Sequence, residues 1–398
     1  MPHALSSRAL EMAQTLVRMN TVSANSNLEL IDFARDHLRG LGVRSRLTWN
    51  ADKTKANLFA TLGEGKPAGV ILSGHTDTVP WDNQDWSADP LSGSVQDWPG
   101  DPDDASGARL YGRGSADMKG FIAVALANAQ HFVESASPFA VHLALSFDEE
   151  TGCIGVRELI ADMKESGIQP MACIIGEPTN MVPAIAHKGV YRWRCCVRGK
   201  EAHSSLTPES VNAIEMAARL VGKVRDMAEG FEASEPRFDG FDVPFSTASV
   251  GQFHGGIADN VVPRDAEFRY EFRNLPTADA MVMQEELIAY ARQLESGMRR
   301  VAPDAGVSFE TICEVPSFLA SATDPVTRLA QRLAGRSETT LVAFGTEAGL
   351  FKGAGIPTVV CGPGSITQAH QPDEYVTLEQ LARCELFMRG LAMARSVG

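Results

Sequence analysis

The sequence predicts an α/β fold in which a mixed central sheet is flanked by helices, with a smaller α+β domain inserted. Short apolar runs of strand length alternate with stretches of helical periodicity in the first half of the chain. From about residue 188 the strands instead alternate between apolar and polar residues, and the helices become longer. A length of 398 residues also favours two domains, because a single core rarely grows beyond about 250–300 residues.

The first half of the chain contains helices and buried strands in turn. Residues 5–19 and 27–42 carry apolar positions at helical spacing, and the second of these helices should end at Gly40 and Gly42. The expected strands are Val70–Leu72, Val141–Phe147 and Met171–Ile175, with a helix over Met118–Ser135 between the first two. Strands separated by helices favour a sheet covered on both faces, with ligands bound beyond the carboxyl ends of the strands.

The inserted domain is expected over residues 188–302. Val190–Val197 and Ala266–Phe272 read as strands with one partly exposed face, and Asn212–Met227 and Met281–Arg299 as long amphipathic helices. Short strands return after about residue 303. The clearest is Thr358–Cys361, and a closing helix follows over Leu378–Arg395. The first domain is therefore predicted to be discontinuous, over 1–187 and 303–398.

Composition excludes several classes of partner. Acidic residues outnumber basic ones by 50 to 36, for a formal charge of −14, which argues against binding nucleic acid. No apolar run approaches the roughly 18 residues of a membrane span, and no signal-peptide pattern opens the sequence, so a cytoplasmic protein is expected. Seven cysteines without a C-x-x-C pair indicate free thiols, and adjacent Cys195 and Cys196 should face opposite sides of a strand.

A polar, proline-rich stretch at 97–109 interrupts this pattern. It is expected to be a solvated loop between strands.

A histidine followed by an acid marks the end of the strand at 70–72. His75 and Asp77 share one face in extended geometry, so the Asp77 carboxylate can accept one ring N–H of His75 and strengthen the other nitrogen as a metal ligand. A histidine satisfied only by neighbouring polar groups is the alternative at this position.

Acidic residues follow other predicted strands. Asp148, Glu149 and Glu150 repel one another at a strand end, and a divalent cation would relieve that repulsion. One of these carboxylates can bind the metal while its neighbour acts as a general base. A solvated charge run is the alternative here. Asp117 follows a glycine-rich turn, where a helix N-cap is the alternative.

Two histidines and three carboxylates in such positions predict a site for zinc, cobalt or manganese. An odd number of ligands suits two metal ions if Asp117 bridges them. The predicted ligands are His75, Asp117, Glu150, Glu177 and His370. The G-x-S-x-G and H-E-x-x-H motifs of other hydrolases are absent from the sequence.

The motifs SGHTDTVP, YGRGSADMKG, DEETG, GEPT, EAHSS and GPGSITQAHQPDEY occur in this order. Together they resemble the metallohydrolase family of acetylornithine deacetylases, succinyl-diaminopimelate desuccinylases and carboxypeptidase G-type enzymes, over nearly the whole chain. The resemblance implies that His75, Asp117 and Glu177 hold one metal, and that Asp117, Glu150 and His370 hold the other. It also implies that Glu149 is the general base, with Asp77 as the partner of His75.

The same resemblance assigns roles outside the metal site. The inserted domain would be a lid and the interface of a homodimer. Within it His203 would reach the site of the neighbouring subunit and stabilise the oxyanion there, while Asn260 and Arg273 would orient the substrate. A planar guanidinium at Arg273 suits an α-carboxylate, and a surface salt bridge is the alternative there. The segment Gly345–Glu347 is expected to contact the substrate, with Glu347 meeting a side-chain ammonium.

The implied reaction is hydrolysis of an N-acyl amino acid, with two Zn²⁺ per subunit, or Co²⁺ or Mn²⁺ in their place. The leading substrate is N2-acetyl-L-ornithine, which would yield L-ornithine and acetate in arginine biosynthesis. Another N-acyl amino acid or peptide, such as succinyl-diaminopimelate, is the alternative substrate. A binding protein without catalytic activity is a further alternative, but structural metal sites are usually closed by sulfur and histidine ligands.

Overall fold

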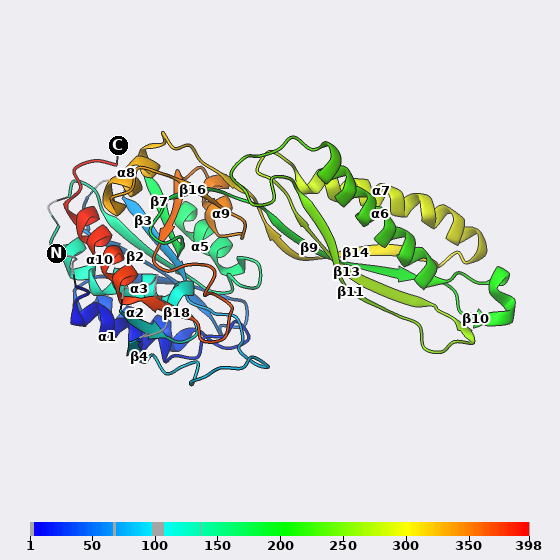
Figure 1. The fold of residues 1–398 in the computed structure, drawn as a ribbon, viewed down its shortest axis with the longest axis horizontal. Helices are drawn as coiled ribbons and strands as arrows, with labels where there is room; N and C mark the ends of the chain where they lie inside the picture. The colour runs from blue at the N-terminus through cyan, green and yellow to red at the C-terminus, as the bar shows by residue number, and fades with distance from the viewer. Residues whose placement is uncertain (1–3, 67–68, 98–106, 136, 398) are drawn as a thin grey trace. The chain divides into compact units, whose positions relative to one another are not determined.

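The computed structural model describes residues 4–66, 69–97, 107–135 and 137–397, and these divide into two compact units. The first unit takes in the described residues up to 186, together with 319–341 and those from 346 onward. The second takes in 187–318 and 342–345 (Figure 1). The second unit extends beyond residue 302, the predicted end of the inserted domain, because strand β14 (Gly306–Val315) pairs with β9 (Val190–Arg198).

The first unit is built on one mixed sheet. Its strands β3, β6, β7 and β17 run parallel to one another, while β1 and β2 are antiparallel neighbours at one side. In sheet order the strands are β1 (Ser45–Trp49), β2 (Ala56–Leu62), β6 (Val141–Ser146), β3 (Val70–His75), β7 (Ala172–Pro178), β17 (Thr358–Gly362), β8 (Ala184–His187) and β15 (Phe318–Leu319), with β16 (Thr340–Val342) paired to β8. The predicted α/β class with a mixed central sheet is therefore confirmed.

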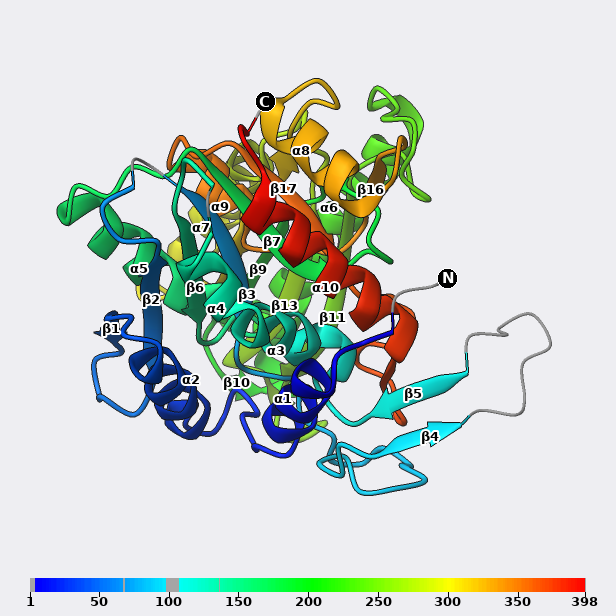
Figure 2. The ribbon, with the colours of Figure 1, turned by 90° about the vertical axis from the view of Figure 1, so that its left-hand side faces the viewer.

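Helices cover both faces of this sheet. One face carries α1 (Ser7–Val17), α2 (Leu28–Gly40), α3 (Gly120–Ala127), α4 (Ala129–Val133), α8 (Pro325–Ala334) and α10 (Leu378–Met393), which share one apolar core with the strands. Figure 2 looks onto this face, with α3 and α10 in front of the sheet. The opposite face carries α5 (Ile154–Glu165), which packs on β2 and β6, and α9 (Ala348–Gly353), which packs on β17.

Several helices begin where the sequence supplies a capping side chain. Ser6 accepts a hydrogen bond from the backbone N–H of Ala9 at the start of α1, and Thr377 does the same for Gln380 at the start of α10. Asn212 and Asp279 cap the two helices of the second unit in the same way. A polar side chain at this position satisfies a backbone donor that has no partner inside the helix.

The predicted helix over 118–135 is wrong as a single element. The chain forms a tight turn at Ser115–Lys119 (η1), then α3, and then α4 after a break at Asn128. Within the turn, Asp117 has non-helical angles (φ −122°, ψ 94°), so it does not cap the following helix. Hydrophobic spacing cannot reveal this break, because the residues on both sides of it are buried.

The loop expected at 97–109 is partly a pair of strands, although residues 98–106 lie outside the described part of the chain. Asp97 ends β4 (Val95–Asp97) and pairs with Ala108 of β5 (Ala108–Tyr111). Strand β18 (Tyr375–Thr377) completes this three-stranded sheet. The guanidinium of Arg109 on β5 lies 4.2 Å from the ring centre of Tyr375 on β18. This cation–π contact gives the charged side chain a favourable partner within the sheet.

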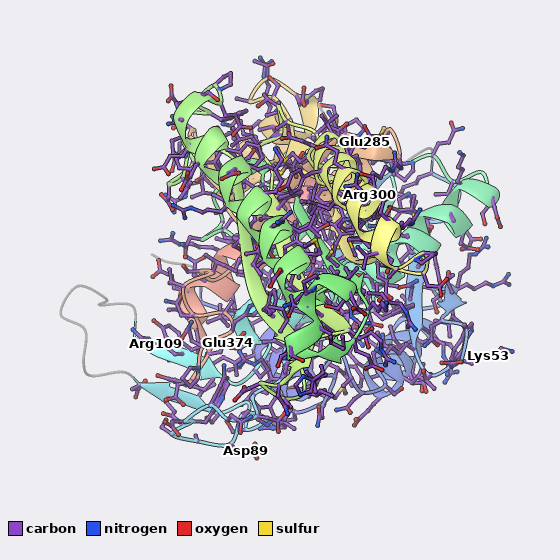
Figure 3. The ribbon with its side chains drawn as sticks, turned by 90° about the vertical axis from the view of Figure 1, so that its right-hand side faces the viewer. Lys53, Asp89, Arg109, Glu285, Arg300 and Glu374 are labelled. Carbon is purple, nitrogen blue, oxygen red and sulfur yellow. The ribbon has the colours of Figure 1, made fainter. Side chains whose placement is uncertain are left out.

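The second unit is a four-stranded antiparallel sheet covered on one face. In order its strands are β11 (Thr247–Gly255), β13 (Asp265–Arg273), β9 and β14. Helices α6 (Ala213–Ser234) and α7 (Ala280–Val301) cover it; Figure 3 shows them side by side, with Glu285 and Arg300 labelled on α7. Cys195 lies in the core beneath the helices, whereas Cys196 faces the opposite side of β9 and is partly exposed, as predicted.

Two further findings concern composition. The seven cysteines are all in the thiol form, and six of them are buried. Within the described ranges, every helix is either too short or too polar to cross a lipid bilayer.

A buried histidine in the first unit gives the stability of the protein a dependence on pH. His142 on β6 is 6% exposed, stacks on Phe59, and lies 3.0 Å from the hydroxyl of Thr61. Burial lowers its pKa to about 4, whereas an unfolded chain would have an ordinary histidine value near 6.5. Between these two values the unfolded state binds more protons, so the contribution of His142 to the free energy of unfolding falls as the pH falls.

We expect a His142→Phe variant to lose less stability than the original protein between pH 7 and pH 4.5. The difference should approach about 1.4 kcal/mol per pH unit in the steepest part of the range. Urea unfolding at a series of pH values measures it, with exchange of the exposed His131 for Phe as the control. Parallel curves for the His142→Phe variant and the original protein would show that His142 does not cause the effect.

Candidate metal centre

The parallel strands of the first unit end at one edge of the sheet, where the predicted ligands lie. His75 is the last residue of β3 and is in register with Ser146, the last residue of β6. Glu177 lies near the end of β7, and Glu150 follows β6 after a short turn. Because parallel strands bring their carboxyl ends to the same side, residues far apart in the sequence meet there.

The first group of possible ligands consists of His75, Asp117 and Glu177. His75 Nε2 lies 2.9 Å from Asp117 Oδ1 and 3.7 Å from Glu177 Oε1. All three residues are buried. One donor atom from each lies within 4.8 Å of the others, which is close enough for a single cation to contact all three.

The second group consists of Asp117, Glu150 and His370. His370 Nε2 lies 3.3 Å from Asp117 Oδ2 and 3.1 Å from Glu150 Oε2. The three donor atoms again lie within 4.8 Å of one another. His370 is the exposed member, with 47% of its side chain accessible, whereas only 9% of the Glu150 side chain is accessible.

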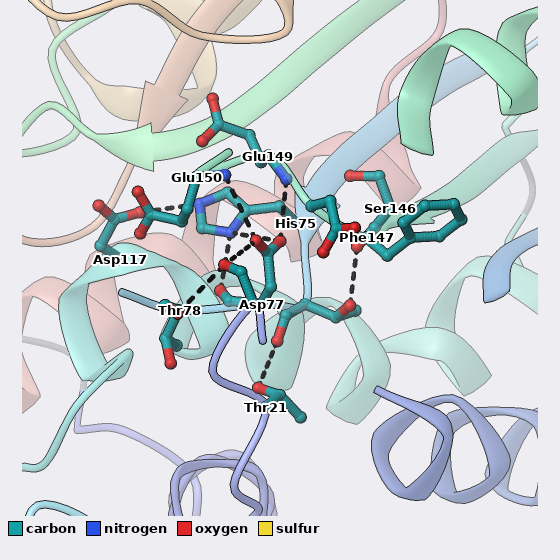
Figure 4. Close-up of polar contacts among 12 residues, drawn as sticks. Thr21, His75, Asp77, Thr78, Asp117, Ser146, Phe147, Glu149 and Glu150 are labelled. Carbon is teal, nitrogen blue, oxygen red and sulfur yellow. Dashed lines mark hydrogen bonds and ion pairs between the residues drawn. The ribbon is translucent and has the colours of Figure 1, made fainter. Parts of the chain in front are cut away.

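Asp117 belongs to both groups. Its Oδ1 faces His75 and its Oδ2 faces His370, so the two oxygens of one carboxylate point to different histidines. Figure 4 shows Asp117 beside the ring of His75, with Glu150 nearby. This is the arrangement in which a carboxylate can bridge two cations.

The charges of the cluster are unbalanced on the carboxylate side. Burial raises the pKa values of Glu150 and Glu177, and the nearby Asp117 carboxylate raises them further. Hydrogen bonds to Asp117 and Glu150 raise the pKa of His370 to about 10. The cluster therefore favours extra protons on these groups.

His75 and Asp117 show the same balance. Burial acts to lower the pKa of His75, but contacts with Asp117 and Asp77 outweigh it and hold the value well above the ordinary one. Burial likewise acts to raise the pKa of Asp117, but the two histidines outweigh it and lower the value.

The donor set fits a pair of divalent cations. Imidazole nitrogens and carboxylate oxygens are the ligands that zinc, cobalt and manganese share. A cation would replace the protons that the buried cluster otherwise holds, because metal ligands must be deprotonated to bind. Each group supplies three protein ligands, which leaves room for water or substrate, as in catalytic sites.

Asp77 holds the segment that carries the acids after β6. Its carboxylate accepts hydrogen bonds from the backbone N–H groups of Glu149 (3.1 Å) and Glu150 (3.3 Å), and from the hydroxyl of Ser23 (2.6 Å). The Nδ1 of His75 lies 3.0 Å from the main-chain oxygen of Asp77 and 3.6 Å from its carboxylate. The sequence predicted a hydrogen bond from the ring N–H of His75 to the Asp77 carboxylate. In the structure the main-chain oxygen of Asp77 is the nearer acceptor for that N–H.

Glu149 lies beside the ligands without belonging to either group. Its Oε1 is 3.3 Å from the thiol of Cys153, a fully buried residue in the same turn. Burial raises the pKa of Glu149 well above its ordinary value, and the neighbouring Glu150 adds to this. Such an environment favours the protonated form of the carboxyl group, which is the form that can act as a general acid.

Glu347 is buried below the edge of the sheet, close to the ligands. It is 1% exposed, and the hydroxyls of Ser73 (3.1 Å) and Ser146 donate hydrogen bonds to its carboxylate. Thr346 is also fully buried, and its hydroxyl accepts from the N–H of Ala348.

The remaining predicted residues belong to the second unit. His203 ends β10 (Ala202–His203), which pairs with β12 (Val261–Val262), and its side chain is exposed. Asn260 precedes β12 and is also exposed. Arg273 ends β13 and forms an ion pair of 2.6 Å with Glu271, the salt bridge that was the alternative for this residue. Gly345 is the last residue of this unit.

Sequence reasoning assigned no role to Arg113 and Glu374, although both lie in quoted motifs. In the structure they form a buried ion pair of 2.8 Å beside the Asp117 turn. In the sequence, Arg113 and Glu374 are distinguished only by their charge and by their positions in two motifs. Neither feature indicates that the two side chains contact each other.

Known proteins resemble this chain over most of its length. The profile of peptidase family M20/M25/M40 matches residues 71–394. An acetylornithine deacetylase of Myxococcus xanthus is 35% identical over 384 residues, covering 93% of each chain. One from Pasteurella multocida (strain Pm70) is 32% identical over 379 residues, also covering 93% of each.

A solved structure shows the same fold. An M20 family metallo-carboxypeptidase from Sulfolobus solfataricus superposes with a TM-score of 0.73 at 17% identity. The match covers 97% of this chain and 99% of that one. The similarity in architecture therefore extends through both units.

Proposed function

The chain belongs to peptidase family M20/M25/M40, and we propose that it is a metal-dependent hydrolase that removes the acyl group from an N-acyl amino acid. The proposed reaction converts N2-acetyl-L-ornithine and water into L-ornithine and acetate, the activity for which the relatives are named. The observation that carries the proposal is that the two carboxylate oxygens of the buried Asp117 face different histidines.

In this proposal one metal is held by His75, Asp117 and Glu177, and the other by Asp117, Glu150 and His370. Zn²⁺ is the proposed metal, with Co²⁺ and Mn²⁺ as the alternatives that the same donors allow. When bound, such cations polarise a carbonyl oxygen and make water a stronger nucleophile at neutral pH.

Glu149 is proposed as the general base. A carboxylate oxygen of Glu149 takes a proton from the attacking water and later donates it to the nitrogen of the leaving amine, so that the C–N bond breaks to give an acid and an amine. Its raised pKa makes the ionised carboxylate a stronger proton acceptor from water. Asp77 supports this role by fixing the backbone N–H groups of Glu149 and Glu150.

The second unit is proposed to act as a lid and as the interface of a homodimer. There His203 would stabilise the oxyanion, while Asn260 and Arg273 would orient the substrate. Arg273 would exchange its partner Glu271 for the α-carboxylate of the substrate. An unchanged KM in an Arg273→Lys variant would exclude that role, since a lysine cannot reproduce the two parallel hydrogen bonds.

Glu347 is proposed to meet the side-chain ammonium of ornithine, with Gly345 and Thr346 shaping the same wall. Because Ser73 and Ser146 already donate to Glu347, the ammonium would join an existing hydrogen-bonded carboxylate.

Six buried cysteines in the thiol form support a reducing compartment, and we propose the cytoplasm.

Turnover of two substrates tests the proposed function. We expect the purified protein, supplied with Zn²⁺, to hydrolyse N2-acetyl-L-ornithine with a higher kcat/KM than N-succinyl-diaminopimelate. Release of the free amine measures both reactions. A preference for the succinyl compound would move the assignment to a desuccinylase, and hydrolysis of neither would exclude both substrates.

A further inference from the structure

The histidine of the second metal group lies on a loop that needs external support. The His370 side chain is 47% exposed, whereas its partners Asp117 and Glu150 are largely buried. The backbone of both His370 (φ 62°) and Asp373 (φ 56°) is left-handed, a conformation that non-glycine residues rarely adopt. Such a loop keeps its shape only if neighbouring groups hold its backbone.

Gln84 supplies one such contact from a distant part of the sequence. Its side-chain Nε2 donates a hydrogen bond of 2.9 Å to the main-chain oxygen of His370. Its Oε1 accepts two hydrogen bonds, from Arg113 Nη2 (2.6 Å) and from the indole N–H of Trp86 (3.1 Å). The amide of Gln84 therefore links the His370 loop to Arg113.

Arg113 continues the chain of contacts to the Asp117 turn. It is fully buried, and its Nη1 donates to Glu374 Oε2 at 2.8 Å. The other oxygen of Glu374 accepts hydrogen bonds from the backbone N–H groups of Ala116 (2.9 Å) and Asp117 (3.1 Å). The main-chain oxygen of Glu374 also accepts a hydrogen bond from the backbone N–H of Gly112, so Glu374 is attached both to the Asp117 turn and to the segment just before it.

A buried ion pair of this kind is weak evidence for a gain in stability. Removing two charges from water costs about as much free energy as their attraction returns, and apolar replacements are often as stable. The Arg113–Glu374 pair does have a geometric effect, because Glu374 bonds directly to the Asp117 turn and Arg113 reaches the main chain of His370 through Gln84. That observation favours a positioning role over a contribution to stability.

We propose that Gln84, Arg113 and Glu374 are positioning residues that hold Asp117 and His370 at the distance required for the second metal. The inference rests on the proposed metal centre. It also predicts that changes at Gln84 and at Glu374 affect the binding of the two metals differently. Gln84 supports His370, which belongs to the second group alone, whereas Glu374 supports Asp117, which belongs to both groups.

The test is a calorimetric titration of the chelator-stripped protein with Zn²⁺, with a Gln84→Glu variant as the main comparison. The glutamate keeps an acceptor for Arg113 and Trp86 but cannot donate to the main-chain oxygen of His370. We expect one of the two Zn²⁺ ions to bind about 10–100-fold more weakly and the other to bind as before, because loss of a supporting hydrogen bond typically has an effect of this size.

Two further variants complete the experiment. A Glu374→Gln variant should weaken both ions, since it disturbs the shared Asp117. Gln96→Glu on β4 makes the same chemical change at an exposed residue whose amide donates to Ser94, and both ions should bind it normally. The melting temperature of each metal-free variant separates these effects from unfolding.

The outcomes distinguish the inference from the function on which it rests. Two ions binding equally well to the Gln84→Glu variant and to the original protein would overturn the positioning role and leave the metal centre in place. An original protein that binds fewer than two Zn²⁺ ions would overturn the metal centre itself, and this inference with it. If Glu374→Gln does not fold, the comparison between Gln84→Glu and Gln96→Glu still decides the question.

Discussion

Replacement of Glu149 by Gln is expected to lower kcat for N2-acetyl-L-ornithine by about 10²–10⁴-fold, the usual contribution of general acid–base catalysis. Glutamine has nearly the same shape but cannot accept and return a proton. The effect should fall on kcat more than on KM, because the proton transfers belong to the transition state and not to substrate binding.

The position of Glu149 makes this variant informative. It lies outside both groups of ligands, so the variant should keep two metal ions per subunit. Its backbone N–H is bound by Asp77, and a glutamine leaves that contact unchanged. A lower kcat at full metal content would therefore report the missing carboxylate.

The control for this experiment is Glu158→Gln. Glu158 is exposed on α5, and removing its charge there should leave turnover unchanged. Metal content by atomic emission spectroscopy and steady-state kinetics are measured on both variants. Normal turnover by the Glu149→Gln protein would remove this residue from the mechanism.

Replacement of Asp117 by Asn should have the second large effect, a loss of metal together with a fall in kcat/KM of about 10³-fold or more. An amide has one oxygen and one NH₂ group, and the NH₂ group offers no lone pair to a cation. Whichever way the amide turns, either the His75 group or the His370 group loses a ligand. A metal-bound site supplies several kcal/mol of transition-state stabilisation, and each 1.36 kcal/mol is a factor of ten in rate.

The metal content of the Asp117→Asn variant is measured after dialysis against a weak chelator. We expect fewer than two ions per subunit, and turnover that excess Zn²⁺ restores only in part. The exposed Asp226 on α6 provides the matched Asp→Asn control. Two tightly bound ions in the Asp117→Asn protein would contradict the bridging role.

Some parts of the fold and the site could be predicted from local sequence because they depend on neighbours in the chain. The apolar run at 70–72 and the polar residues that follow it identify a strand end, and His75 is the last residue of β3. Alternation along 190–197 places Cys195 and Cys196 on opposite faces, and the structure agrees. In such cases the periodicity of burial within one element carries the information.

Other parts could be proposed only from the whole set of motifs. The pairing of His75 with Glu177, and of His370 with Glu150, came from resemblance. The local sequence around the two histidines does not indicate which glutamate shares a metal with which histidine. In the structure His75 meets Glu177 because β3 and β7 are adjacent and parallel. Glu150 follows β6 on the other side of β3, and His370 comes from the loop after β17, the strand that pairs with β7. Strand order in a sheet is not encoded in the periodicity of any single strand.

Tertiary structure alone decided the conformation around Asp117 and the support of His370. The helical spacing over 118–135 predicted one helix, whereas the structure has a turn, a helix and a break there. The residues of the turn and of the helix are all buried, so their hydrophobic pattern does not change where the backbone conformation changes. Gln84 and Glu374 gained their roles from partners far away in the chain. A hydrogen bond between distant segments leaves no trace in local composition, since it forms only when the sheet brings those segments together. The sequence by itself therefore determined which residues could bind metal, and the folded sheet decided which of them meet.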